Sequence, residues 1–251
     1  MKITAIARER RHTLHFLREI RAISPVFLGT DVDMTAVVRH RDTVQKHSIV
    51  TYVLHTAARV LVAHPEANAA MRGHLRPRIA HHTSANGKFT LDRTVNGQRI
   101  VLSTVLRDLQ RSSLAEIQAQ VNHFRDSDPD EMPEFAGARL LQRMPIPLGG
   151  LLFRLGVRPL SRRGEQFGTF AVTSLGHRPV DSFHSVGGTT VTLGVGRIAE
   201  RPVVRGGSVV PAPVMHLSLT FDHRVIDGAE AADVLSEIKY ALEGFGGKEP
   251  S

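Results

Sequence analysis

The sequence predicts a protein of the α+β class, in which helices and extended segments are mixed without regular alternation. Strand-like segments concentrate after Gly168, whereas the first half of the chain carries several amphipathic helical patterns. A chain of 251 residues with 41% hydrophobic residues can bury a substantial core. A doubly wound nucleotide-binding sheet would instead alternate strands with helices, so we do not expect that fold.

The first half of the chain alternates amphipathic and extended patterns. A basic amphipathic pattern ends at Ser24-Pro25, because the residue before a proline is pushed out of the helical region. Asn86-Gly87 and Asn96-Gly97 are turn signals. We expect a helix over residues 5–23, a strand over Val26–Val32, a short helix capped by Asp33-Met34-Thr35, a helix over Ile49–Ala63 stopped near Pro65, and extended chain over Ile79–Leu91 and Val95–Leu106.

A further helix is expected to begin at Ser112 or Ser113 and to reach about Arg125, because Ser113 and Glu116 have the spacing of a capping box. The acidic, proline-bearing stretch that follows predicts a loop. Phe135–Arg163 is leucine-rich, spotted with arginines and broken by prolines. It predicts one or two short amphipathic helices within an insertion at about residues 126–166. Packing on the body, contact with a partner subunit and contact with a membrane surface are the alternatives, and the first is favoured.

The last third of the chain is rich in strand-forming residues and ends in an amphipathic helix. The expected strands are Thr169–Thr173, Thr189–Leu193, Val203–Val204 and Val214–Phe221, and the helix has Ala231, Val234, Leu235, Ile238 and Leu242 on one face.

Composition excludes several classes of function. The chain has no cysteine, so disulfides, thiolate metal sites and a cysteine nucleophile are excluded. No segment has the roughly 20 apolar residues of a membrane span, and no signal peptide is found, so we expect a cytoplasmic protein. The net charge is +8, but the cations look scattered and aromatic residues are only 5%, which argues against nucleic acid and favours a phosphate-bearing cofactor or an acidic partner.

Two motifs are set aside. Gly194-Val195-Gly196 fits a dinucleotide-binding fingerprint in letters only, because extended chain follows where that motif needs a helix. Fourteen histidines suggest metal binding, yet only His12 and His15 share a helical face at useful spacing. We therefore expect no metal site.

One histidine lies where chemistry is expected. Leu217–Asp222 alternates like a half-buried strand that ends at His223, and Asp227-Gly228 begins the last helix. A histidine at a strand end is held by rigid scaffold while its ring reaches outward, as general-base catalysis requires. The alternatives are a helix-capping Asp227 and a histidine that only satisfies the turn.

Several blocks of the sequence resemble the dihydrolipoamide acyltransferases, which form the catalytic cores of 2-oxoacid dehydrogenase complexes and are related in fold to chloramphenicol acetyltransferase. The blocks keep the family's order across nearly the whole chain. They are Asp31-Val32-Asp33-Met34-Thr35, His64-Pro65-Glu66-Ala67-Asn68, Val105-Leu106-Arg107-Asp108, Ser113-Leu114-Ala115-Glu116-Ile117, Gly168–Gly176, Leu193–Ile198, Arg201–Val204, and His223-Arg224-Val225-Ile226-Asp227-Gly228-Ala229.

The resemblance implies a mixed sheet flanked by helices, a chloramphenicol acetyltransferase-like two-layer sandwich, assembled as homotrimers or multiples of trimers. It makes His223 the general base and Thr173 the hydroxyl that stabilises the oxyanion, with Ser174 as the fallback. Asp227 would order the loop around the histidine, paired with Arg11 or Arg18. The histidine and the hydroxyl would come from neighbouring chains.

By resemblance, the activity is acyl transfer between a coenzyme A thioester and a dihydrolipoyl-like thiol or another small nucleophile. No residue is assigned to coenzyme A. Lipoyl and peripheral-subunit-binding domains are not found, so residues 1–251 are interpreted as one catalytic domain. A stand-alone acyltransferase is favoured. The alternatives are a dehydrogenase-complex core that uses a lipoyl group supplied in trans by another chain, and an inactive scaffold.

Overall fold

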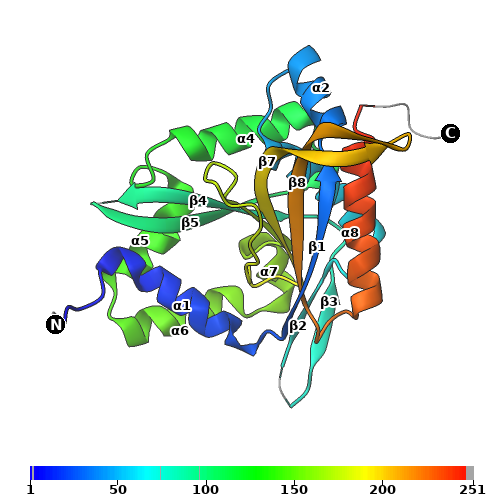
Figure 1. Cartoon of the computed structure of the whole chain (residues 1–251). Helices are drawn as coiled ribbons and strands as arrows, with labels where there is room; N and C mark the ends of the chain where they lie inside the picture. Colours follow the sequence, from blue (N-terminus) through cyan, green and yellow to red (C-terminus); the bar gives the residue numbers. More distant parts are fainter. Residues whose placement is uncertain (2, 74, 96, 247–251) are drawn as a thin grey trace.

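The computed structural model describes residues 1, 3–73, 75–95 and 97–246. Its helices are α1 (Arg11–Glu19), α2 (Thr35–Thr43), α3 (Ile49–Ala63), α4 (Leu114–Asp126), α5 (Ala136–Arg143), α6 (Ile146–Val157), α7 (Leu160–Gln166) and α8 (Gly228–Glu243) (Figure 1). Its strands are β1 (Pro25–Asp33), β2 (Ala69–Arg72), β3 (Arg78–His81), β4 (Gly87–Val95), β5 (Gln98–Leu106), β6 (Phe170–Ser174), β7 (Val191–Arg205) and β8 (Ser208–Asp222).

The strands form a six-stranded mixed sheet in the order β1-β8-β7-β6-β4-β5, and β2 pairs separately with β3. β6 runs parallel to both β7 and β4, whereas the other pairings in the large sheet are antiparallel. The predicted α+β class and the mixed sheet with flanking helices are therefore confirmed.

One face of the large sheet is buried beneath α3 and α8, and α8 runs beside β1 (Figure 1). The helix α3 is apolar on most of its circumference, so it packs against the sheet, α4 and α8 together. Phe170 and Val172 of β6 belong to this core, as do Ile238 and Leu242 of α8. The core holds β6 and the end of β8 rigidly, and these are the two places where the candidate residues lie.

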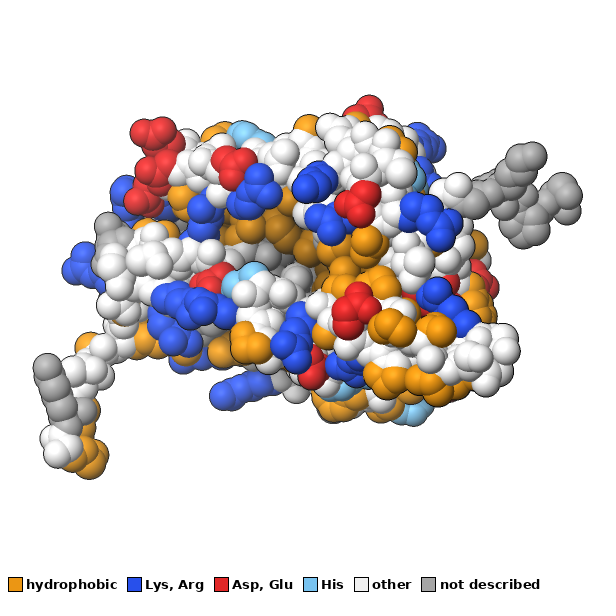
Figure 2. Space-filling model, turned by 45° about the horizontal axis from the view of Figure 1, so that its top comes forward, with side chains coloured by type: hydrophobic (Ala, Val, Ile, Leu, Met, Phe, Trp, Pro, Cys, Tyr) orange, Lys and Arg blue, Asp and Glu red, His pale blue; other side chains and the backbone are white. Residues whose placement is uncertain are grey.

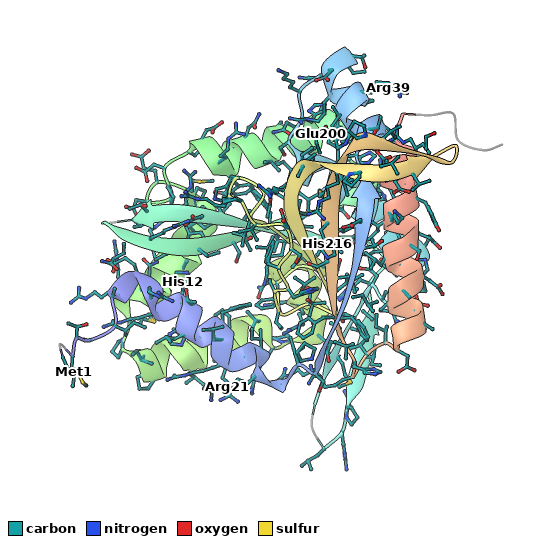
Figure 3. All side chains as sticks on the ribbon, viewed as in Figure 1. Met1, His12, Arg21, Arg39, Glu200 and His216 are labelled. Atoms are coloured by element: carbon teal, nitrogen blue, oxygen red, sulfur yellow. The ribbon has the colours of Figure 1, made fainter. Side chains whose placement is uncertain are left out.

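The other face is covered differently. An irregular segment, residues 175–190, crosses it, and α1 lies beside the β4–β5 hairpin with α5 and α6 (Figure 1). His12 points from α1 toward that hairpin, where its Nε2 lies 3.1 Å from the carbonyl oxygen of Val101 (Figure 3). The insertion at about residues 126–166, for which the sequence predicts one or two helices, contains three α-helices. Of these, α5 and α6 pack on α1, and α7 packs on β2 and β3.

Two further differences from the sequence prediction have physical causes. The strand β2 gives no local signal, because it is only four residues long and is fixed by pairing with β3. The separately predicted strands around Leu193 and Val203 are one continuous strand, β7, which passes through Pro202. Pro202 pairs with Pro211 in the part of the β7–β8 hairpin that extends beyond β6, where a missing amide hydrogen bond is tolerated.

Candidate active site

His223 lies in the turn that follows β8, as the sequence predicts. Its backbone amide donates a 2.9 Å hydrogen bond to the carbonyl of Ser24, at the entrance to β1. Its ring meets the edge of Phe221, with the ring centroids 5.4 Å apart. The backbone is thus fixed by a partner 199 positions away in sequence, while the side chain remains 47% exposed.

The ring nitrogen Nδ1 of His223 faces two acceptors. The carbonyl oxygen of Ile226 lies 3.2 Å away, and Oδ1 of Asp227 lies 3.4 Å away. Because both groups accept hydrogen bonds, they favour the tautomer with the proton on Nδ1. In that tautomer Nε2 has a free lone pair, which is what a general base requires.

Asp227 occupies the N-cap position of α8, yet its side chain makes no capping hydrogen bond. The capping alternative for this residue therefore has no support in the geometry. Its carboxylate is 90% exposed, and within the described residues its one ion pair is with His223. Neither predicted arginine reaches it: Arg11 donates to the carbonyls of Gln142 and Met144, and Arg18 lies beside α6. The expected pairing with Arg11 or Arg18 is therefore wrong within one chain.

The loop is ordered by a carboxylate that the sequence analysis did not single out. Asp222, the last residue of β8, is buried, and its Oδ2 accepts a 2.6 Å hydrogen bond from Nη2 of Arg224. Its Oδ1 accepts from the backbone amides of Ser24 and Arg224, at 3.3 and 3.2 Å. These bonds fix the backbone on both sides of His223. An Asp-His-Arg tripeptide at a strand end is the signal that could have identified this pair.

Thr173 and Ser174 end β6, and they point to opposite faces because side chains alternate along a strand. Ser174 shares its side of the strand with the core residues Phe170 and Val172, and its hydroxyl accepts a 3.3 Å bond from the amide of Gly176. Thr173 lies on the face opposite α3 and α8. Within the described residues its hydroxyl makes no hydrogen bond, so the geometry favours Thr173 over Ser174 as a donor to substrate.

The structure does not bring the two groups together within one chain. Thr173 is in register with Gly194 on β7, and Gly194 is in register with Ser218 on β8. His223 follows Ser218 by five residues and is two strands from Thr173, so standard strand dimensions separate the two by about 19 Å. A base and an oxyanion donor must both lie within about 3 Å of their reacting atoms, so one chain alone cannot supply both.

A buried lysine lies on the same side of the sheet as Thr173. Lys88 of β4 is paired with Ala171, and its Nζ donates a 2.5 Å hydrogen bond to the carbonyl of Gly187. The ammonium also lies 3.9 Å from the ring centre of Phe167 and 4.6 Å from that of Phe16. Burial, and then the charge of Arg163, lower the pKa of Lys88 from 10.5 to about 7.

The mixed sheet and its flanking helices define an acyltransferase fold of the chloramphenicol acetyltransferase type. A chloramphenicol acetyltransferase superposes with a TM-score of 0.51 at 16% identity, covering 98% of this chain and 97% of that one. The dihydrolipoamide acetyltransferase of Azotobacter vinelandii superposes with a TM-score of 0.70 at 20% identity, covering 97% of this chain and 91% of that one. At these identities the two structures show the fold alone.

The sequence comparisons identify the family. Residues 159–247 match the model of the 2-oxoacid dehydrogenases acyltransferase catalytic domain. The acetyltransferase component of the pyruvate dehydrogenase complex of Bacillus subtilis is 28% identical over 225 residues, which cover 86% of this chain and 44% of that protein. The chain thus spans less than half the length of this curated relative. The predicted resemblance to the dihydrolipoamide acyltransferase catalytic domain is confirmed.

Other kinds of site find no support in the described part of the chain. It contains no group of three or more histidine and acidic side chains placed to hold a metal ion. None of its helices is long and apolar enough to cross a membrane.

Proposed function

We propose that this protein is a coenzyme A-dependent acyltransferase that moves an acyl group between coenzyme A and a dihydrolipoyl-like thiol. The observation that carries the proposal is the orientation of His223. Its Nδ1 faces the carbonyl of Ile226 and the carboxylate of Asp227, which leaves Nε2 free to accept a proton. The family match over residues 159–247 supports the same reaction, because it covers this turn, β6 and α8.

The proposed reaction begins when Nε2 of His223 takes the proton of the acceptor thiol. The sulfur attacks the thioester carbonyl of acyl-coenzyme A, and a carbon–sulfur bond forms as the carbonyl becomes an oxyanion. When the tetrahedral intermediate collapses, the bond to the coenzyme A sulfur breaks. The leaving thiolate takes the proton back from Nε2, so the histidine ends in its starting form.

The hydroxyl of Thr173, rather than that of Ser174, is the proposed donor to the oxyanion. Removing one such donor typically costs about 10²- to 10³-fold in rate. Asp227 is proposed as a positioning residue that holds the ring of His223. The Azotobacter vinelandii acetyltransferase structure comes from investigations of the role that a serine, a histidine and an asparagine four positions after that histidine have in its catalytic mechanism. His223 and Asp227 have the same spacing, which supports the assignment.

We further propose a homotrimer in which His223 of one chain meets Thr173 of its neighbour. The separation within one chain requires a second chain to complete the site. Phe27 and Asp31 on the outer face of β1 are exposed, as His223 is, and a neighbour would cover them and exclude water. Light scattering in solution tests the assembly, and a monomer would contradict it.

A lipoyl group is the proposed acyl carrier, because the curated relatives are named as dihydrolipoyllysine-residue acyltransferases, and its supply in trans by another chain is part of the same proposal. The cytoplasm is the proposed compartment. Its support is the family's role in dehydrogenase complexes, together with the lack of a spanning helix in the described residues.

The activity is tested by release of free coenzyme A from acetyl-coenzyme A, with dihydrolipoamide as acceptor. We expect His223→Ala to lower the rate by roughly 10²- to 10⁴-fold. His123 is a matched control, because it is also exposed and lies 3.4 Å from a carboxylate, that of Glu134. The proposal is wrong if His223→Ala turns over as fast as His123→Ala. No turnover by the wild type with any acceptor thiol would favour the inactive scaffold.

A further inference from the structure

The helix α6 exposes a stripe of leucines. Leu148, Leu151, Leu152 and Leu155 are between 38% and 63% exposed. Their spacing of three and four residues places them along one side of the helix. The opposite side, with Gly149 and Val157, is the buried one and packs toward α1. A helix on a protein surface normally turns its apolar stripe inward, so an outward stripe indicates that something else covers it.

The same helical layer carries the whole net charge of the protein. Residues 8–22 and 136–166 together contain eleven arginines and three glutamates, which gives +8. The formal charge of the complete chain is also +8, so the remainder is neutral overall. The cations that look scattered in the sequence are brought together by the packing of α1 against α5 and α6. Figure 2, in which the top of the molecule comes forward, shows blue side chains on several parts of that face, including beside the extended N-terminal segment.

A groove of about 440 Å³ separates the leucine stripe from α1. Arg18, Arg154 and Arg158 line it, and Leu151 is shared between the groove and the stripe. Arg158 lies 3.6 Å from Glu19, whereas within the described residues Arg18 and Arg154 have no carboxylate partner. The groove thus offers unpaired cations directly beside exposed aliphatic side chains.

A symmetric contact between this layer in two copies of the chain is unfavourable, because the +8 charge of one layer would face the +8 charge of the other. The stripe itself consists of leucines, which are under-represented among the side chains that dominate protein–protein binding energy, so its composition favours a lipid surface over a protein partner. A row of leucines flanked by arginines is instead the pattern of a helix that lies in the plane of a membrane surface. Each such arginine raises the affinity for a membrane of anionic lipids by about fivefold.

We propose that α6 and the adjoining groove form a peripheral binding site for anionic phospholipid membranes, in which the leucines enter the acyl-chain boundary and Arg18 and Arg154 contact lipid phosphates. This inference does not depend on the proposed acyl transfer. It places the enzyme on a membrane surface without a spanning helix.

Co-sedimentation of the full chain with vesicles tests the proposal. We expect binding to vesicles that contain phosphatidylglycerol, weaker binding at high salt, and little binding to pure phosphatidylcholine. The double variant Leu151→Ser/Leu155→Ser is expected to weaken binding roughly tenfold or more, and Arg154→Gln about fivefold. Leu75→Ser/Arg76→Gln is the matched control, because both residues are exposed in the β2–β3 connection. Circular dichroism and thermal melting confirm that each variant is folded.

Three results would overturn the proposal. The first is an equal affinity of the leucine variant and the control for the anionic vesicles. The second is binding to soluble polyglutamate that is stronger than vesicle binding and insensitive to the leucine variant, which would assign the layer to an acidic protein. The third is coenzyme A binding that Arg154→Gln weakens, together with no binding to the anionic vesicles, which would assign the arginines to the substrate.

Discussion

His223 and Asp227 face each other across the turn between β8 and α8, with Nδ1 3.4 Å from Oδ1 of the carboxylate. The carboxylate is almost fully exposed, so water screens its charge and it contributes little as a counter-ion. Its position matters more, because it lies on the side of the ring away from the reacting nitrogen. Together with the carbonyl of Ile226 it fixes which nitrogen carries the proton.

A positioning role for Asp227 predicts a specific pattern among its variants. Asp227→Asn keeps an acceptor oxygen near Nδ1, so we expect a rate within about threefold of the wild type. Asp227→Ala leaves the ring held by one carbonyl and is expected to lower kcat roughly tenfold, with KM nearly unchanged. Steady-state kinetics with acetyl-coenzyme A measures both constants. Asp233→Ala, on the exposed side of α8, is the control. Equal losses in the asparagine and alanine variants would show that the charge acts instead.

The shared active site predicts complementation between two inactive variants. Thr173→Val removes the hydroxyl but keeps the shape, and is expected to cost about 10²- to 10³-fold, whereas Thr173→Ser retains most of the rate. Co-expression of Thr173→Val with His223→Ala should then produce trimers in which about a quarter of the sites contain both native residues. The activity of the co-purified mixture, compared with each variant alone, checks this. Activity no higher than that of the two variants alone would mean that both groups act within one chain.

The buried ammonium of Lys88 predicts that stability increases with pH. Its folded pKa is about 7, whereas the unfolded chain keeps the ordinary value of 10.5. Between these values the unfolded state binds more protons, so the free energy of unfolding rises as the pH increases from 7 toward 10.5. Lys88→Met should abolish this rise, because methionine fills the space between Phe16 and Phe167 without a charge. Urea unfolding across this pH range tests it. The exposed Lys46→Met should keep the wild-type slope, and the same slope in Lys88→Met would refute the assignment.

Much of the fold follows from local sequence signals. The helix α3 has the predicted bounds, because its apolar pattern is continuous and Pro65 lies just beyond its end. The helix α4 begins with the predicted capping box, in which the Ser113 side chain accepts from the amide of Glu116 and the Glu116 side chain accepts from the amide of Ser113. The apolar pattern, the terminating proline and the capping box each depend on residues three to five positions apart, so a single sequence is enough to find them.

Features that depend on distant partners could not be found in this way. The backbone of His223 is held by Ser24, and the helices α5 and α6 pack against α1, which lies more than 110 positions earlier in the chain. Asp222 was missed because burial, rather than residue type, distinguishes it from Asp227. The charged layer was missed because its two segments are far apart in sequence. Counting charges by segment, rather than along the whole chain, would have shown it.

His64 lies between two glutamates, and it predicts a dependence of stability on pH that is opposite to that of Lys88. Nδ1 of His64, at the end of α3, lies 2.8 Å from Glu230, and its Nε2 lies 3.1 Å from Glu237 on α8. Burial lowers the pKa of His64, but the two glutamates outweigh it and raise the value above 6.5. The folded state therefore binds the proton more tightly than the unfolded state. The resulting stabilisation is fully present below pH 6.5 and is lost as the pH rises through the folded pKa.

The variant His64→Gln isolates this contribution. Burial lowers the pKa of His55 to about 4 and also lowers the pKa of His12. These two histidines therefore change the free energy of unfolding with pH in the opposite direction to His64, and the wild-type pH dependence is the sum of all three contributions. The difference in the free energy of unfolding between wild type and His64→Gln should be largest in mildly acidic solution and shrink toward alkaline pH. His81→Gln is the control, because His81 is exposed and lies 3.9 Å from Glu66. A difference that grows as the pH rises would show that His64 is neutral in the folded protein and that the link between α3 and α8 does not depend on its charge.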